Sequence, residues 1–265
     1  MGKFITPKKV STVKLNKFFT ENDLSFLLKE SKNNIYQINE LTKKTPYKPE
    51  LNDLYRLYKL ILLNKRTTVL EFGSGWSSLI ISLALNKLKK NFLNNTKNLR
   101  RNNLFELFVI ENEKKYLNIT KKRIKNFYKK KKNNCKINFS YSDVNMIQFN
   151  NHIATEFIKL PMCNPDFIYL DGPDQFNVKK HINGISTKHN DLMPMACDIL
   201  KIEYFLIPGT IILVDGRGAN VKFLRDNFKR NWLYKYDKPF DQHIFYLNDP
   251  SIGKYNDRQL KFYNS

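Results

Sequence analysis

The chain has 265 residues, and a hydrophobic content of 42% is enough for one sizeable core. Its apolar runs are about as long as strands and fall short of the roughly 20 residues that cross a bilayer, so no membrane span is expected. Residues 1–20 carry no apolar segment followed by a small-residue cleavage site, which argues against secretion.

The cysteine pattern points in the same direction. The chain has three widely separated cysteines, Cys135, Cys163 and Cys197, and no CxxC pair. This pattern excludes a disulfide framework and a cysteine zinc site, and it predicts a cytoplasmic protein.

Positive charge dominates the composition. Lysine and arginine number 46 against 24 aspartates and glutamates, a formal net charge of +22. Such a charge favours a nucleic-acid or anionic-membrane partner. The chain is also rich in Lys, Asn, Ile, Phe and Tyr, the residues that an AT-rich genome over-supplies. The positive charge can therefore also result from this biased amino-acid composition on a solvated surface, without an anionic partner.

The first 64 residues are predicted to be helical. Apolar residues indicate a short helix over residues 20–31, and they recur at helical spacing over residues 50–64. We expect residues 1–64 to form an N-terminal appendage that packs on the main domain or covers its cleft.

Strands and helices alternate after Arg66. Five β-rich runs are separated mostly by segments that can hold a helix, a rhythm that predicts a parallel sheet with crossovers. Two further runs, joined by a short Asp/Pro-containing link, predict a hairpin at the sheet edge. The expected fold is α/β: a doubly wound, mostly parallel seven-stranded sheet with an antiparallel last strand, within residues 65–250, followed by a tail over 251–265. The seven runs are residues 67–72, 104–111, 136–141, 166–171, 210–215, 232–236 and 242–247.

Helices and loops between these strands follow from composition. A helix is expected over residues 77–90, a solvated loop over 89–103, and a helix with a charged outer face over 121–132. The stretch 175–195 is polar and long for a connection, which is typical of a lid or a substrate-contacting loop.

The first strand ends in a glycine turn that suits a ligand. Residues 69–78 read VLEFGSGWSS, in which Gly73 and Gly75 let the backbone turn sharply and approach a ligand closely. The dinucleotide pattern G-x-G-x-x-G would need a glycine where Ser78 stands, which disfavours NAD. Glu71 would repel a phosphate but attract an ammonium group, so a cationic ligand is expected.

Acids recur at the ends of the next two strands. Glu111, followed by Asn112, is placed to accept hydrogen bonds from ribose hydroxyls. Ser142 and Asp143 follow the third strand. Acids at the carboxyl ends of successive strands lie at the edge where open α/β sheets bind ligands.

These features resemble motif I and the following strand ends of the class I, Rossmann-like S-adenosylmethionine-dependent methyltransferases. The resemblance covers about residues 67–247 and is greatest to small-molecule O-methyltransferases, although Ser77 stands where the family has a third glycine. It implies that the methionine portion, the ribose and the adenine of S-adenosylmethionine are held by three groups of residues: Glu71, Gly73, Ser74, Gly75 and Ser77; Glu111 and Asn112; and Ser142 and Asp143.

The fourth and fifth strands supply the predicted reaction centre. Asp171 follows the fourth strand, and Asp215 ends the fifth, so the two carboxylates are expected to face one another across the site. Asp171 is also expected to contact the cofactor, and Asp174 to bind substrate. Methyl transfer needs a nucleophile held close to the methyl group and a group that removes its proton. The Asn/Asp-Pro-Pro-aromatic signature of base-amine methyltransferases is absent.

The same two acids predict a cation site. Asp171 and Asp215 suit Mg²⁺, which would acidify a substrate hydroxyl. The pattern is similar to metal-dependent O-methyltransferases, which have an Asp-Asn pair at the fifth strand, but here Gly216 replaces the Asn. Asp174 or water would have to supply the missing ligand. Alternatively, Asp215 acts on the substrate and binds no metal.

Two other side chains are candidates for the acceptor pocket. Arg217 could bind a carboxylate or phosphate of the substrate with two parallel hydrogen bonds. His243, at the start of the last strand, could act as a base or as a hydrogen-bond donor.

The sequence therefore predicts a cytoplasmic S-adenosylmethionine-dependent methyltransferase that acts on a hydroxyl of a small molecule or sugar. Three alternatives stay open. The first is an RNA methyltransferase, which the net charge favours. The second is a binding module that has the same fold but no catalytic activity. The third is an aminopropyltransferase, a class that shares the first two acids. The sequence specifies no oligomeric state.

Overall fold

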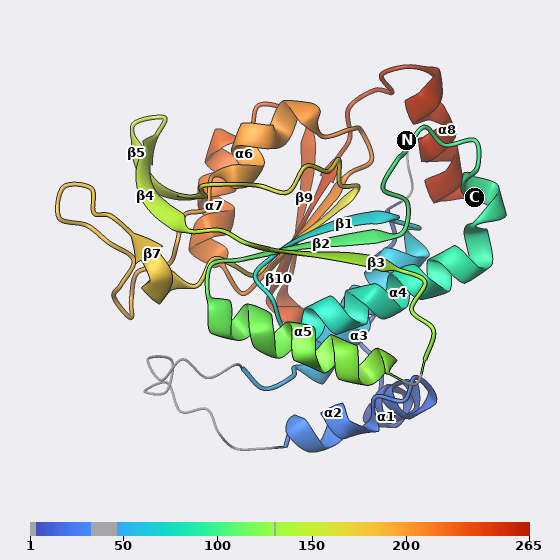
Figure 1. Ribbon diagram of the computed structural model, residues 1–265. Helices are drawn as coiled ribbons and strands as arrows, with labels where there is room; N and C mark the ends of the chain where they lie inside the picture. Colours follow the sequence, from blue (N-terminus) through green and yellow to red (C-terminus); the bar gives the residue numbers. More distant parts are fainter. Residues whose placement is uncertain (1–3, 33–46, 130) are drawn as a thin grey trace.

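The computed structural model describes residues 4–32, 47–129 and 131–265 (Figure 1). A seven-stranded sheet forms its centre, with strand order β3-β2-β1-β6-β8-β10-β9. All seven predicted strands are present. They are β1 Thr68–Phe72, β2 Glu106–Glu111, β3 Lys136–Tyr141, β6 Phe167–Leu170, β8 Ile211–Asp215, β9 Trp232–Asp237 and β10 Gln242–Leu247.

Strand directions also follow the prediction. β1 pairs in parallel with β2 and β6, β2 with β3, and β6 with β8, while β10 runs antiparallel to both β8 and β9. β1, with all five residues buried, lies at the centre of the sheet. The predicted doubly wound, Rossmann-like fold is thus confirmed, and the carboxyl ends of five parallel strands lie at one edge.

Helices cover both faces of this sheet (Figure 1). One face packs on α3 Leu51–Leu63, α4 Trp76–Phe92 and α5 Lys114–Tyr128. The other face packs on α6 Asp198–Ile202 and α7 Gly218–Asn227. Each layer has its own apolar cluster, as alternation of side chains along buried strands requires.

The N-terminal region differs in part from the prediction. The helix expected over residues 20–31 is the shorter α2 Ser25–Glu30, and a helix that was not predicted, α1 Thr12–Glu21, precedes it. Asp23 lies between them with a φ of 59°, a left-handed conformation that interrupts a helix. α3 matches its prediction, and α1, α2 and α3 share the apolar cluster of α4.

The C-terminal residues expected as a tail contain a helix, α8 Lys254–Asn264. Its Asn256, Gln259, Phe262 and Tyr263 are buried, at the spacing of one helical face. The loop expected over 89–103 is shorter, since α4 continues to Phe92 and a 3-10 turn covers Asn94–Thr96. The boundaries at residues 64 and 250 stay predictions.

A second, three-stranded sheet was not predicted. It consists of β4 Val144–Phe149, β5 His152–Phe157 and the short β7 Val178–Lys179, in the order β5-β4-β7. β7 lies inside the polar stretch 175–195, so this stretch is anchored to the segment that follows β3. Among the described residues, no helix is long and apolar enough to cross a bilayer.

Candidate functional site

The loop after β1 packs directly on the loop after β6. Gly73 has a φ of +95°, and its N–H donates to the carbonyl of Ile110 at the end of β2. A Cβ on Gly172 would lie 2.5 Å from the Gly73 nitrogen, which leaves no room for a side chain. Gly75 differs, because among the described residues a Cβ there would meet only the Ser77 hydroxyl, at 3.7 Å. The backbone at Gly75 therefore faces open space, as the approach of a ligand requires.

Glu71 lies beneath this turn and holds it in place. Its carboxylate accepts hydrogen bonds from the hydroxyls of Ser77 (2.5 Å) and Ser78 (2.6 Å) at the start of α4. The side chain is fully buried, so the predicted direct contact of Glu71 with a cationic ligand does not match its position. The hydrogen bond between Ser77 and Glu71 supports the glycine turn from beneath.

Burial also determines the charge of Glu71. Desolvation raises the pKa of Glu71 to about 8, although the two serine hydroxyls act in the opposite direction. The folded chain then holds a proton here that the unfolded chain releases near its ordinary pKa. Between these values the free energy of unfolding falls as pH rises, by up to about 1.4 kcal/mol per pH unit.

Substitution of Glu71 with glutamine is therefore expected to reduce the loss of stability as pH rises from about 4.5 to about 8. Urea unfolding across this range measures the slope. Glu21→Gln, at an exposed position on α1, is the matched control and should keep the slope of the unmodified chain. An equal slope in Glu71→Gln and in the control would contradict this account of Glu71.

Glu111 is the best-placed ligand for a ribose. It ends β2 next to the glycine turn, and it is 2% exposed. One carboxylate oxygen accepts from the Ser74 hydroxyl at 2.8 Å, and the other from the N–H groups of Asn112 (2.8 Å) and Glu113 (2.9 Å). The two N–H groups fix the carboxylate, and the Ser74 hydroxyl occupies the oxygen that the predicted ribose contact would use.

Burial raises the pKa of Glu111 to about 7, and the hydrogen bonds from Glu113, Ser74 and Asn112 oppose this rise. Asn112 itself connects β2 to the loop after β6. Its amide donates to the carbonyl of Asp174 (3.0 Å), and its oxygen accepts from the Asp174 N–H (2.8 Å). The role of Asn112 is thus to position this loop.

Ser142 and Asp143 follow β3 on the same edge. The Ser142 hydroxyl accepts from the N–H of Lys159, and it donates to the carbonyl of Asp143. The Asp143 carboxylate accepts from Lys179 on β7 and from Tyr141, and both hydrogen bonds lower its pKa. Asp143 is therefore ionised and partly exposed, and its predicted contact with adenine stays a prediction.

Asp215 ends β8 and Asp171 directly follows the neighbouring strand β6, so the two acids lie at the same edge of the sheet, as predicted. The Asp171 side chain is 53% exposed, and the Arg217 Nε lies 3.9 Å from its Oδ1. Desolvation raises the pKa of Asp171 to about 7; Arg217 opposes this rise and the negative charge of Asp215 adds to it. Solvent reaches the Asp171 carboxylate, but the protein atoms around it limit its hydration, which raises its pKa.

A chain of buried polar groups holds Asp215. Tyr169 donates to Oδ2 of Asp215 at 2.7 Å, and the Gln242 amide donates to Oδ1 at 3.2 Å. Gln242 in turn accepts from Arg56 on α3 at 3.0 Å, and Arg56 also pairs with Asp237 at 2.5 Å. The orientation of Asp215 thus depends on the N-terminal helices. Tyr169, Gln242 and Arg56 were not predicted from the sequence, although an arginine among the apolar residues of a helix is a signal for a buried partner.

The residues predicted to bind substrate, Arg217 and Asp174, form hydrogen bonds with backbone groups of the protein. One Arg217 nitrogen donates to the carbonyls of Asp171 (2.6 Å) and Pro173 (3.2 Å), so Arg217 holds the loop after β6. Asp174 accepts from the N–H groups of Phe176 and Asn177. Tyr47 lies close enough for the charges of Asp171 and Asp174 to contribute, after burial, to the rise of its pKa. A segment just before α3 therefore approaches this site.

His243 lies apart from these acids. It pairs across the sheet with Val214, while its neighbour Gln242 pairs with Asp215, and successive side chains of a strand point to opposite faces. The His243 ring stacks against Tyr236 (4.5 Å between centroids) and hydrogen bonds to Tyr234. This packing gives the predicted catalytic role of His243 no support, and Gln242 is the residue of β10 that reaches the site.

The predicted Mg²⁺ site does not fit the side chains. No group of three or more His, Cys, Asp or Glu suited to a metal occurs among residues 4–32, 47–129 and 131–265. Both oxygens of Asp215 already accept hydrogen bonds, Asp174 caps a turn, and the positive Arg217 lies beside Asp171. The metal prediction is therefore not carried further.

Comparison with known proteins gives distant structural similarities only. No protein-family model matches the chain, and no curated protein matches it. Similar solved structures include the O-methyltransferase TomG of Streptomyces achromogenes, involved in tomaymycin synthesis and in complex with SAM, which is 11% identical over 92% of both chains (TM-score 0.39). An O-methyltransferase from Bacillus cereus in complex with SAH is 12% identical over 91% of this chain and 92% of its own (TM-score 0.38).

A third structure is a TDP-rhamnose 3'-O-methyltransferase of calicheamicin biosynthesis, 12% identical over 87% of this chain and 94% of its own (TM-score 0.42). With similarities this distant, the fold assignment depends on strand order and direction, and the function has to be argued from the site.

Proposed function

We propose that this chain is an S-adenosylmethionine-dependent methyltransferase that acts on a hydroxyl group of a small molecule or sugar. One observation carries the proposal: the glycine turn with open space at Gly75 lies between the strand-end carboxylates of Glu111 and Asp171. Binding of the cofactor needs a fixed carboxylate that can hold a ribose, and Glu111 provides it. Proton removal needs an exposed carboxylate beside the open turn, and Asp171 provides it.

When bound, S-adenosylmethionine supplies an electrophilic methyl group on a sulfonium. Glu111 would accept hydrogen bonds from the ribose. The backbone of Gly73, Ser74 and Gly75 would lie along the methionine portion. Asp143 would accept a hydrogen bond from the adenine amino group. Asp171 is the base. The Asp171 carboxylate would take up the proton of the acceptor hydroxyl, so that the hydroxyl oxygen could accept the methyl group that bound S-adenosylmethionine would supply. Asp215, held by Tyr169 and Gln242, orients the acceptor.

This mechanism needs no metal, because a pKa of about 7 makes the Asp171 carboxylate a competent base near neutral pH. Methyl transfer is therefore expected to continue at the same rate when EDTA is added. The measurement is transfer of label from methyl-tritiated S-adenosylmethionine, with and without EDTA. If EDTA abolished methyl transfer and added Mg²⁺ restored it, the reaction would depend on a metal and the metal-free mechanism would be wrong.

The same assay separates the proposed acceptor class from RNA, which the net charge of +22 favours. The test uses a panel of catechols and nucleotide-linked sugars beside a tRNA mixture. Label in the small molecules supports the proposal. Label in tRNA alone would overturn the acceptor class and leave the cofactor assignment in place.

A further inference from the structure

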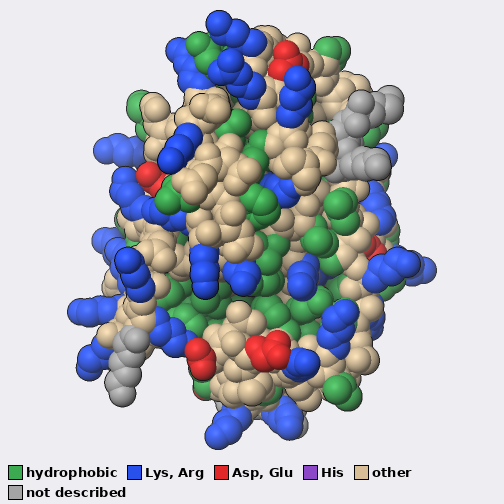
Figure 2. All heavy atoms as spheres, turned by 90° about the vertical axis from the view of Figure 1, so that its right-hand side faces the viewer, with side chains coloured by type: hydrophobic (Ala, Val, Ile, Leu, Met, Phe, Trp, Pro, Cys, Tyr) green, Lys and Arg blue, Asp and Glu red, His purple; other side chains and the backbone are tan. Residues whose placement is uncertain are grey.

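A cavity of about 510 Å³ opens at the amino-terminal edge of the main sheet, opposite the candidate site. Its walls come from the segments that lead into β2, β6 and β8 and from the start of α8. This volume falls within the range of about 300–1,000 Å³ that is usual for small-molecule sites. Figure 2 shows this face of the molecule, where Lys and Arg side chains are frequent and Asp and Glu are few.

The lining of this cavity is positively charged. Three lining residues are basic, namely Arg100, Arg101 and Lys254, and no described lining residue is Asp or Glu. Asp257 belongs to the first turn of α8 but not to the lining. Most other lining residues carry amides, which can donate to oxygen atoms.

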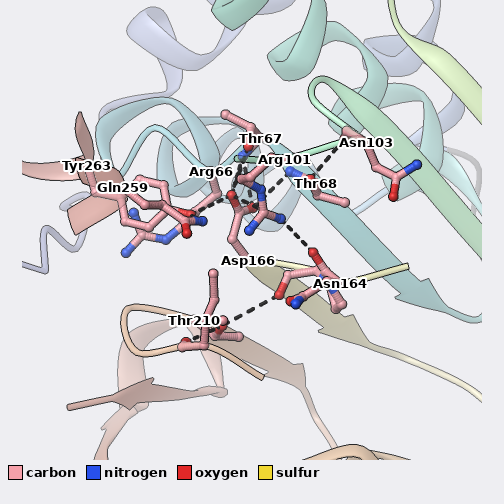
Figure 3. Close-up of polar contacts among 12 residues, drawn as sticks. Arg66, Thr67, Thr68, Arg101, Asn103, Asn164, Asp166, Thr210, Gln259 and Tyr263 are labelled. Carbon is pink, nitrogen blue, oxygen red and sulfur yellow. Dashed lines mark hydrogen bonds and ion pairs between the residues drawn. The ribbon is translucent and has the colours of Figure 1, made fainter. Parts of the chain in front are cut away.

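Arg101 is held rigidly at the inner wall (Figure 3). Its side chain is 7% exposed, it donates to the carbonyl of Asn164 at 2.5 Å, and it lies 3.8 Å from the carboxylate of Asp166. That carboxylate also accepts from Thr67, Thr68 and Tyr263. The Arg101 Nε is buried without a partner among the described residues. The charge of Arg101 is thus only partly compensated from within the protein.

The other two cations gather around one exposed ring. The Arg100 guanidinium lies 5.1 Å from the centroid of Tyr255, and the Lys254 ammonium 5.2 Å. Lys254 belongs to the first turn of α8, which begins after Gly253 and has no side-chain cap, and Arg100 reaches the same ring from the segment before β2. The first N–H groups of a helix have no acceptor within it, and they attract anions.

We propose that this cavity binds the phosphate groups of a phosphorylated small molecule of about nucleotide size. Arg100 and Lys254 would contact the phosphate oxygens, with the N–H groups of the first turn of α8 beside them and Arg101 behind. The cavity is partly open to solvent, and its volume of about 510 Å³ suits a ligand of about nucleotide size better than a longer nucleic-acid chain. The site lies at the other edge of the sheet, so it is independent of the proposed methyl transfer.

The test is calorimetric titration of the full chain with inorganic pyrophosphate, with UDP and with a ten-residue oligouridylate. Saturable binding of UDP or pyrophosphate is expected, weaker at high salt. The double variant R100A/K254A changes two exposed side chains and should weaken that binding at least about tenfold, since charge-assisted hydrogen bonds are lost. The control K122A/K125A removes the same charge from α5 and should change the affinity less than about twofold.

Two results would overturn the proposal. One is equal weakening in the variant and in the control, because general charge would then explain binding. The other is binding of the oligouridylate with no binding of UDP or pyrophosphate, which would make this face a nucleic-acid surface. S-adenosylmethionine affinity should be unchanged in R100A/K254A, so failure here is distinguishable from failure of the proposed function.

Discussion

Replacement of Asp171 with asparagine is expected to lower the turnover number by about 100- to 10,000-fold, the usual contribution of a general base. Asparagine keeps the size and one oxygen of the side chain but cannot take up a proton. Because Asp171 is exposed and the Gly172 backbone next to it forms the packed turn, the shape of the site should survive the change. Steady-state methyl transfer, with S-adenosylmethionine binding measured in parallel, gives the result.

The pH dependence identifies Asp171 more closely. The unmodified chain needs Asp171 ionised, so kcat measured at saturating S-adenosylmethionine should rise with pH up to about 7 and then level off. The residual activity of Asp171→Asn should lack this rise. Asp191→Asn, at an exposed aspartate of the 175–195 stretch, is the matched control and should behave as the unmodified chain. Turnover of Asp171→Asn within about fivefold of normal would remove Asp171 from the role of base.

Replacement of Glu111 with alanine is expected to weaken S-adenosylmethionine binding by about 1–3 kcal/mol, through loss of hydrogen bonds from the ribose to a carboxylate. In the unmodified chain, affinity should also fall as pH drops below about 7, because protonated Glu111 accepts less well. Isothermal titration calorimetry across this pH range measures both effects.

The matched control for Glu111 lies on the same strand. Glu106 begins β2 at the opposite edge of the sheet and pairs there with Lys136. Glu106→Ala should leave the affinity for S-adenosylmethionine unchanged. If Glu111→Ala binds as tightly as the control, Glu111 takes no part in the site.

Local patterns in the sequence predicted most of the fold, because the inner strands β1, β6 and β8 are buried apolar runs, while the edge strands β3 and β9 are β-rich but only partly buried. The strand-end acids followed from the same reasoning, since parallel strands place their carboxyl ends at one edge. The hairpin of β4 and β5 was missed although its turn is visible in the sequence. Asn150 and Asn151 adopt φ values of 48° and 63°, the conformation that asparagine tolerates in two-residue hairpins.

Contacts between distant segments could not be predicted from local patterns. Arg56 meets Gln242, 186 residues further along the chain, and this contact exists only because α3 packs beside β10. The same limit applies to Glu71, whose pattern suggested a ligand contact but whose carboxylate is enclosed by the serines of α4. The partners of a buried acid depend on the whole fold, so the local pattern could not show that the carboxylate of Glu71 faces the start of α4.

The central claim is that the glycine turn and Glu111 form a site for S-adenosylmethionine. Calorimetric titration of the purified chain with S-adenosylmethionine and S-adenosylhomocysteine, compared with Glu111→Ala, tests it most directly. The account predicts saturable binding of both compounds with one site per chain, and weaker binding in the variant. Absence of binding by either compound would contradict the account, and the turn and the acids would then be structural features of the fold.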